Sequence, residues 1–346
     1  MMKKRLDYID IAKGIAIIYV VLSHISIGFL AKHVSSFYMP FFFFLSGLVF
    51  DEKKFKNYKE LFLKKGDLLK KYFSLSIILL ILYLILNKIL ITNLSTLIFG
   101  IFYSRYYITK TSKISLLGIS NNALWYLPSL FLIFVLYFTI CKLSKNKKQK
   151  MFFSIILFII GLLLNNYFSF LFPWNFDTSL ICVIFFCIGD VFKKNIKQAY
   201  EQFNIIKAIL IFSLTLILNL LSINYNGMIN LSIGVYYDYL LFVVGALSGI
   251  VLYLIIAMFI SKYLSIVKKI LCYIGTKSLE IFLYHMPIIN LVLLPIYYNC
   301  FSKFMLYQET LSYGIVSTTV VILVIIFFDY FKGKVVNLYA NKKINI

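Results

Sequence analysis

Charged residues are scarce in this sequence. Asp, Glu, Lys and Arg make up 14% of the 346 residues, and acidic side chains are the scarcest, with 13 Asp and Glu against 35 Lys and Arg. Soluble domains usually carry about a quarter charged residues and are near half apolar. Here 62% of the residues are apolar and the mean hydropathy is +0.90. The composition excludes an ordinary soluble domain and predicts a membrane protein.

Residues that hold metals or form redox centres are also few. The three histidines are well separated, and the five cysteines show neither metal-type nor redox-type spacing. Most of the cysteines lie in or beside apolar runs, where a free thiol behaves as a small hydrophobe. They are Cys141, Cys182, Cys187, Cys272 and Cys300. We therefore expect no metal site and no permanently bound cofactor.

Several catalytic and modular signatures are missing as well. The sequence contains no glycine-rich phosphate loop and no lipase-type serine elbow. No internal repeat, long loop or low-complexity tail marks off a second domain. We expect a single transmembrane domain over residues 1–346, so any catalysis must occur within the helix bundle or at its two mouths.

Long apolar runs are what the sequence has in abundance. A bilayer-crossing helix needs roughly 20 mostly apolar residues, and about ten such runs follow one another here. The expected fold is therefore all-α, a polytopic membrane bundle of about ten transmembrane helices. The predicted spans are residues 11–31, 36–51, 72–91, 122–141, 151–167, 178–192, 204–222, 238–260, 277–298 and 312–331.

Two segments depart from this simple pattern. The second predicted span is short and contains Pro40 and Gly47, so we expect it to be broken or tilted and to face protein rather than lipid. Ser46 and Gly47 favour close helix packing, and Ser46 is not predicted to be a nucleophile. Residues 92–121 are polar and aromatic with an apolar piece at 94–103, which predicts an interfacial helix or a re-entrant loop.

The positive charges indicate the orientation of the bundle. With a cytoplasmic N-terminus, all but six of the Lys and Arg residues lie in or beside cytoplasmic segments. The six exceptions are Lys32, Lys88, Arg105, Lys110, Lys113 and Lys303. Both termini are therefore expected in the cytoplasm. Because the lysines lie in short loops and form no separate basic domain, nucleic-acid binding is not expected.

The most basic stretch, "EKKFKNYKELFLKKGDLLKK", follows the second span. Its simplest interpretation is an anchor that fixes the membrane orientation. The alternative is a docking surface for an anionic cytoplasmic ligand.

The first helix carries three ionisable residues, Asp10, Lys13 and His24, in "DIAKGIAIIYVVLSH". Their spacings place them within roughly 40° of one stripe, and Lys13 and His24 are separated by roughly 16 Å along the axis. Lys13 is then expected near the cytoplasmic mouth, where it would hold phosphate groups, with His24 deeper as a base. Alternatively His24 bonds a neighbouring helix and Lys13 extends to the headgroups. Asp10 is close enough to neutralise Lys13.

Four segments in order resemble the signature segments of acyltransferase family 3, and most closely its fucose 4-O-acetylase-like branch. They are "DIAKGIAIIYVVLSH", "FYMPFFFFLSGLVF", "NNALWYLPSLFLIF" and "GTKSLEIFLYHMPI". The resemblance implies an integral enzyme of a bacterial cell membrane. It further implies acetyl-CoA or another acyl-CoA as donor substrate, and a sugar hydroxyl of a surface polysaccharide or lipid-linked glycan as acceptor.

The same resemblance assigns the two ends of the stripe in the first helix. The family has a basic residue, ten intervening residues and then a histidine, which fall on Lys13 and His24. His24 is thus implied to be the catalytic histidine. Most of the family has arginine at the first position, and the lysine found here keeps the charge but loses the bidentate fork.

Candidate acceptor-binding residues lie at the predicted outer ends of two spans. Asn122, Trp125 and Tyr126 would form a sugar platform, in which rings stack on sugar faces and amides bond hydroxyls, or they belong to an ordinary interfacial aromatic belt. Asp238 would bind acceptor hydroxyls, or simply begin a helix. His33, in the first outer loop, is expected to be solvated.

The segment "SLEIFLYHMP" holds Glu280, Tyr284 and His285. Glu280 and Tyr284 share a helix face, whereas Glu280 and His285 are about 140° apart around the axis. A buried Glu280 would pair with Lys13 or orient a histidine. We expect Glu280 and His285 in catalysis and Tyr284 beside the thioester as an oxyanion donor, with a structural polar network as the alternative.

Two other classes of function remain open from the sequence. One is a flippase or transporter of lipid-linked sugars, although transporters often show the inverted repeats that are missing here. The other is a non-catalytic subunit of a polysaccharide export complex. The partners expected of the enzyme are acyl-CoA, the glycan acceptor and the bilayer, and a homo-oligomer is left open.

Overall fold

The computed structural model describes residues 6–25, 29–87, 94–105, 107–109, 122–293 and 314–328, and within these ranges the fold is all-helical with no strand. The helices are α1 (Asp7–Ile25), α2 (Phe29–Ser35), α3 (Tyr38–Leu48), α4 (Tyr58–Lys65), α5 (Asp67–Asn87), α6 (Leu94–Tyr103), α7 (Tyr126–Leu143), α8 (Lys147–Tyr167), α9 (Phe176–Glu201), α10 (Ile205–Tyr225), α11 (Tyr239–Tyr263), α12 (Ser265–Thr276), α13 (Ser278–Ile288) and a last helix at Gly314–Phe328. Shorter helical turns are η1 (Glu52–Lys54), η3 (Asn122–Trp125), η4 (Pro173–Asn175), η5 (Leu231–Ile233) and η6 (Ile289–Leu293).

Within the described part of the chain, six helices are long and apolar enough to cross a membrane. They are α1, α7 with the turn before it, α8, α9 with the turn before it, α10 and α11. The other four predicted spans coincide with α3, α5, α13 with η6, and the last helix. The predicted multi-pass helical bundle is therefore confirmed, while the count of ten spans and the orientation of the termini stay predictions.

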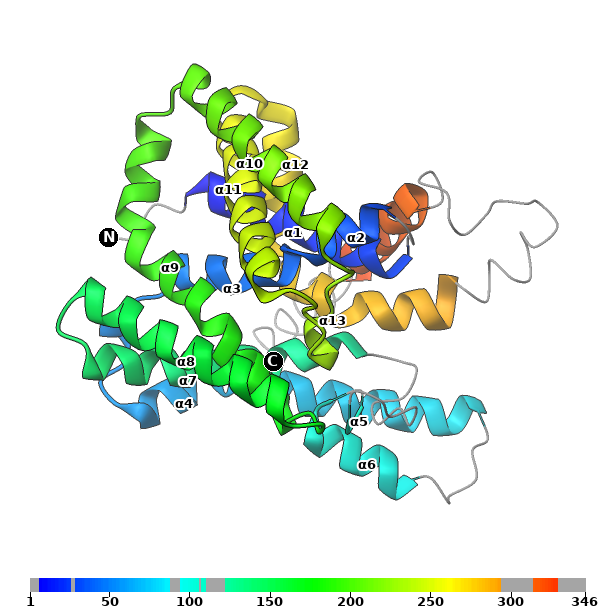
Figure 1. Ribbon diagram of the computed structural model, residues 1–346. Helices are drawn as coiled ribbons and strands as arrows, with labels where there is room; N and C mark the ends of the chain where they lie inside the picture. Colours follow the sequence, from blue (N-terminus) through cyan, green and yellow to red (C-terminus); the bar gives the residue numbers. More distant parts are fainter. Residues whose placement is uncertain are drawn as a thin grey trace, which may run out of the picture.

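Helix α3 joins the two halves of the bundle. It contacts α9 on one side and α1 and α11 on the other. In Figure 1, α1, α10, α11 and α12 lie together in the upper half, and α4, α7 and α8 lie in the lower half with α3 between them. As expected, α3 is short, at 11 residues, and most of its side chains are buried against protein. The first predicted span contains α1 and the start of α2, and residues 26–28 between these helices lie outside the described residues.

Glycines allow the closest helix contacts. Gly47 of α3 faces Gly189 of α9, and a methyl group at either position would strike the backbone of the other helix. Gly14 of α1 and Gly275 of α12 form a second contact of this kind. Small residues let helix backbones approach closely, so the packing role expected of Gly47 is confirmed.

A buried arginine joins the segment after α6 to the start of α9. Arg105 donates hydrogen bonds from Nε to the Phe172 carbonyl at 3.0 Å and from Nη1 to the Ser232 carbonyl at 2.7 Å, and its Nη2 pairs with Asp177. Both charged side chains are buried. The planar guanidinium satisfies three acceptors from separate segments at once.

The segment around residues 92–121 contains a helix, α6, over its apolar piece. Its Phe99 and Phe102 are exposed, whereas Gly100 and Ile101 are buried, so the helix is apolar on its outer face as well. An apolar exposed face agrees with either an interfacial or a re-entrant position, and both stay predictions. Residues 110–121 lie outside the described residues.

The expectation that His33 is solvated is wrong. His33 lies on α2 and is 8% exposed. Its Nε2 is 3.3 Å from the Tyr253 hydroxyl of α11, and its ring contacts Phe37. The helix α2 places His33 against α11, where a solvated loop had been expected.

Candidate functional site

Two of the three histidines, far apart in sequence, lie side by side. The ring centres of His24, in the last turn of α1, and His285, on α13, are 5.2 Å apart with the ring planes 43° from one another. The two rings differ in accessibility: His24 is exposed, whereas His285 is fully buried. Of the two rings, that of His24 is therefore the more accessible.

The backbone of α13 determines the hydrogen bonding of His285. Nδ1 lies 2.8 Å from the Phe282 carbonyl and 3.2 Å from the Ile281 carbonyl. Because a carbonyl only accepts, Nδ1 must carry the proton, and Nε2 of the neutral ring then keeps a lone pair. The buried Nε2 has no hydrogen-bond partner among the described residues.

The helix that carries His285 becomes irregular immediately after it. Pro287 lies inside α13, where it lacks an N–H to donate, and the chain continues as the π-helical turn η6. Such wide turns in helices occur frequently at functional sites.

A positively charged cavity, here called the basic cavity, lies between α1, α3, α4, α5, α7 and α13. Its volume is about 390 Å³. The described residues of its lining include five lysines and two aspartates, so together they carry a net positive charge: Lys13, Lys54, Lys64, Lys65, Lys71, Asp51 and Asp67. The rest of the lining is mostly aromatic and aliphatic. Such a cavity favours an anionic ligand that also has apolar parts.

An aromatic side chain of the cavity lining connects the basic cavity to the histidine pair. Tyr126 of α7 and Phe282 of α13 both line it, with ring centres 5.1 Å apart. The Phe282 ring centre is in turn 5.8 Å from that of His285. One aromatic ring therefore separates the wall of the cavity from the histidine pair. A row of tilted ring contacts thus connects Tyr126, Phe282, His285 and His24 in that order.

Lys13 and Asp10 lie as the spacing in the first helix predicts. Lys13 lines the basic cavity, and its Nζ is 3.9 Å from Oδ1 of the buried Asp10. The predicted ion pair within α1 is thus confirmed. Asp10 reduces the charge that Lys13 offers to an anion without removing Lys13 from the cavity.

Glu280 and Tyr284 line a second cavity, and neither histidine is among its described lining residues. They share a face of α13, as expected, and line a cavity of about 640 Å³ together with Lys71 and apolar side chains. No ion pair of Glu280 is found among the described residues, and backbone carbonyls rather than Glu280 hold the His285 ring. The angular separation of Glu280 and His285 around the helix explains why the two side chains do not meet.

The predicted acceptor residues do not form one cluster in the described structure. Tyr126 lines the basic cavity, and the buried Trp125 lies against it with ring centres 6.3 Å apart. Asn122 belongs to the turn η3, but its side chain lies outside what the structure describes. Asp238 is exposed and caps α11 by accepting a hydrogen bond from the Leu241 N–H at 2.8 Å. For Asp238 the structure shows an ordinary helix start.

Four lysines of the basic cavity were not singled out individually from the sequence. Lys54, Lys64, Lys65 and Lys71 all belong to the stretch that follows the second span. The local density of positive charge was the signal that could have identified them. A membrane anchor gives the same signal, so only the fold shows that these side chains converge on one cavity.

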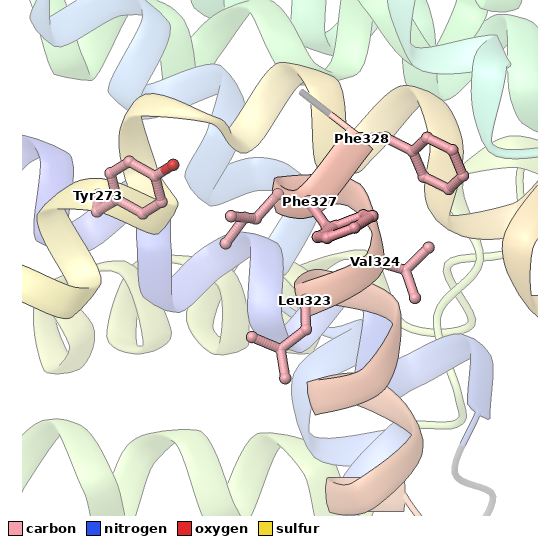
Figure 2. Close-up of a pocket in the computed structure, with 6 residues that line it drawn as sticks. Tyr273, Leu323, Val324, Phe327 and Phe328 are labelled. Carbon is pink, nitrogen blue, oxygen red and sulfur yellow. The ribbon is translucent and has the colours of Figure 1, made fainter. Parts of the chain in front are cut away.

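A larger cavity, of about 700 Å³, lies between α12 and the last helix but carries little chemistry. Figure 2 shows Tyr273 on one side and Leu323, Val324, Phe327 and Phe328 on the other. Among the described residues of its lining, the phenol of Tyr273 is the one titratable group. We therefore place the candidate site at the histidine pair and the basic cavity.

Comparison with known proteins identifies the family. A search of curated proteins finds no match. The family model of the acyltransferase domain called acyltransferase 3 matches residues 6–330, which include both histidines and every residue of the basic cavity. A match over this much of the chain shows that the protein belongs to acyltransferase family 3.

Proposed function

We propose that the protein transfers an acetyl or another short acyl group from acyl-CoA to a sugar hydroxyl. The acceptor would be a cell-surface polysaccharide or a lipid-linked glycan, and the enzyme would work in the cytoplasmic membrane of a bacterium. Membership of the family supports acyl transfer in a membrane. One observation favours the specific reaction: the exposed His24 ring contacts His285, whose ring in turn contacts Phe282 in the lining of a cavity suited to an anionic donor.

The basic cavity suits the donor because coenzyme A joins phosphates to a long, narrow pantetheine arm. The lysines would pair with the phosphates, and the aromatic lining would cover the apolar parts of the molecule. Lys13 and His24 are separated by roughly 16 Å along α1. A thioester at the end of an extended arm would thus approach the histidine pair while the phosphates stay near Lys13.

In the proposed reaction, His24 acts as the general base. The neutral His24 ring takes the proton of the acceptor hydroxyl as its oxygen attacks the thioester carbonyl carbon. The new carbon–oxygen bond forms and the carbon–sulfur bond breaks. The proton held by His24 then passes to the departing thiolate, which restores the neutral ring. Because Tyr284 lines another cavity, we do not assign it the role of oxyanion donor.

Transfer of a radiolabelled acetyl group tests this function. Membranes that contain the wild type, His24→Ala or His33→Gln, matched for protein abundance, receive acetyl-CoA labelled in the acetyl group and a glycan fraction of the host. We expect base-labile label in the glycan with the wild type and His33→Gln, and at least a hundredfold less with His24→Ala, as for loss of a general base.

Two results would contradict the proposal. The first is equal labelling by His24→Ala and the wild type, which would remove His24 from the reaction. The second is no label with any variant while lipid-linked sugars cross the membrane only when the protein is present. That second result would favour a flippase.

A further inference from the structure

We propose that His285 is a positioning residue for His24, and that its Nε2 accepts a hydrogen bond from the His24 ring. This bond fixes which nitrogen of His24 carries the proton and which is free to act as base. The proposal rests on the proposed function for its effect on the reaction. The arrangement of the two rings can be tested without it.

The backbone of α13 determines which nitrogen of His285 carries the proton. Nδ1 faces two carbonyl oxygens of its own helix, and neither can donate. The neutral ring is therefore held as the Nδ1–H tautomer with a lone pair on Nε2. The contacts are local to α13, so the tautomer does not depend on the rest of the bundle.

The lone pair on Nε2 of His285 lies in a buried position. His285 is fully buried, and Nε2 has no partner among the described residues. A buried acceptor without a hydrogen bond is costly and uncommon in folded proteins. An N–H from a neighbouring group that rotates toward it removes this cost.

The neighbouring group that can donate to this lone pair is the His24 ring. The His24 ring centre is 5.2 Å away. Two imidazole rings joined end to end by an N–H···N bond of about 2.9 Å have centres about 5 Å apart. The two rings are thus at the required separation, and rotation of the His24 ring about its broad χ2 torsion would bring its N–H toward Nε2.

The hydrogen bond between the two rings determines how His24 acts in the reaction. When one nitrogen of His24 donates to His285, the other keeps its lone pair and serves as the base. His24 still donates to His285 after it has taken the substrate proton, so the contact persists through the transfer. An orienting partner of this kind is the third member of many nucleophile–base–orienter arrangements. His285 does not touch substrate in this scheme, in agreement with its burial.

Nitrogen NMR on the full-length protein in detergent tests the ring arrangement. Because the chain has three histidines, ¹⁵N-histidine labelling gives three sets of ring signals, which single substitutions assign.

We expect His285 as the Nδ1–H tautomer and His24 as one tautomer in the wild type. His285→Leu should return His24 to a mixture of tautomers, whereas His285→Gln, which can accept through its amide oxygen, should retain one. His24→Ala should shift the His285 Nε2 signal. A His24 signal that is the same in the wild type and His285→Leu would overturn the proposal.

Kinetics distinguish positioning from mere packing. We expect His285→Leu to lower kcat at least tenfold with an unchanged KM for acyl-CoA, and His285→Gln to recover most of the loss. Equal losses in the two variants, or a loss confined to KM, would contradict a positioning role. If the wild type transfers no acyl group, the proposed function fails, and the NMR result still decides whether the rings are coupled.

Discussion

Nζ of Lys65, the last residue of α4, lies 3.9 Å from the centre of the Phe134 ring of α7. The ammonium group thus rests on an aromatic face inside the basic cavity, where it has lost much of its water. Burial lowers the pKa of Lys65 from its usual 10.5, and the positive charge of Lys54 lowers it further. A desolvated cation in such a place favours an anionic ligand.

This position makes donor binding dependent on pH. Below its pKa Lys65 is charged and attracts the phosphates of acyl-CoA. Above that pKa the free enzyme must take up a proton to bind, so affinity falls as pH rises. We expect the KM for acyl-CoA to begin rising below pH 10.5 in the wild type and later or not at all in Lys65→Arg, which stays charged. Steady-state kinetics from pH 7 to pH 10 measure this, and identical profiles for the two proteins would refute it.

Lys13 offers a second test of the basic cavity. Lys13→Met removes a charge from the cavity wall and leaves the buried Asp10 without this partner, so we expect the KM for acyl-CoA to rise about tenfold. Lys13→Arg keeps the charge and should stay within about threefold of the wild type. Lys59 is exposed and does not line the cavity, so Lys59→Met is the matched control. Equal effects of Lys13→Met and Lys59→Met would show that general surface charge, rather than this site, attracts the donor.

The buried pair of Arg105 and Asp177 leads to a prediction about stability. Removal of one partner leaves the other charge buried, which costs about 3–5 kcal/mol. Arg105→Met and Asp177→Leu should therefore each lower the Tm in detergent substantially, and the double variant should lose less than the sum of the two. Arg105→Lys should also destabilise, because an ammonium group cannot serve three acceptors in the geometry of the guanidinium. Additive losses in the double-mutant cycle would show that the two charges are not coupled.

Features that depend on local sequence could be predicted well. The apolar runs predicted where the long helices lie. The spacing of Asp10, Lys13 and His24 predicted that they share a stripe on α1, because helical geometry relates residues a few turns apart. The same reasoning predicted that Glu280 and Tyr284 share a face of α13, and that Glu280 need not meet His285. Short helices that depend on tertiary contacts, such as α2, were not predicted.

The candidate site itself could be predicted only in part. His24 and His285 were each selected, but their contact joins segments at opposite ends of the chain, and no local pattern indicates such a pairing. The basic cavity depends on where α3 and α4 end relative to α7 and α13. The burial of His33 could not be predicted for the same reason, because it follows from packing against Tyr253 of α11, which is distant in sequence.

The contact of Gly47 with Gly189 links the packing of the bundle to this site. A methyl group at Gly47 would strike the Phe186 carbonyl, and the backbone of α9 cannot move aside as a flexible side chain could. Gly47→Ala must therefore separate α3 from α9. Because α3 also supplies Phe42, Leu45 and Ser46 to the basic cavity, we expect both a lower Tm and a higher KM for acyl-CoA.

A substitution directly after the same helix serves as the control for Gly47→Ala. Val49 is exposed and lines the cavity at the end of α3, so Val49→Ala changes the lining without forcing the helices apart. It should leave the Tm nearly unchanged. A Tm for Gly47→Ala within about 1 °C of the wild type would mean that α3 and α9 can separate at little cost, because a ΔΔG of 1 kcal/mol shifts the Tm by roughly 2–4 °C even in larger domains. The position of α3 would then not be what defines the cavity.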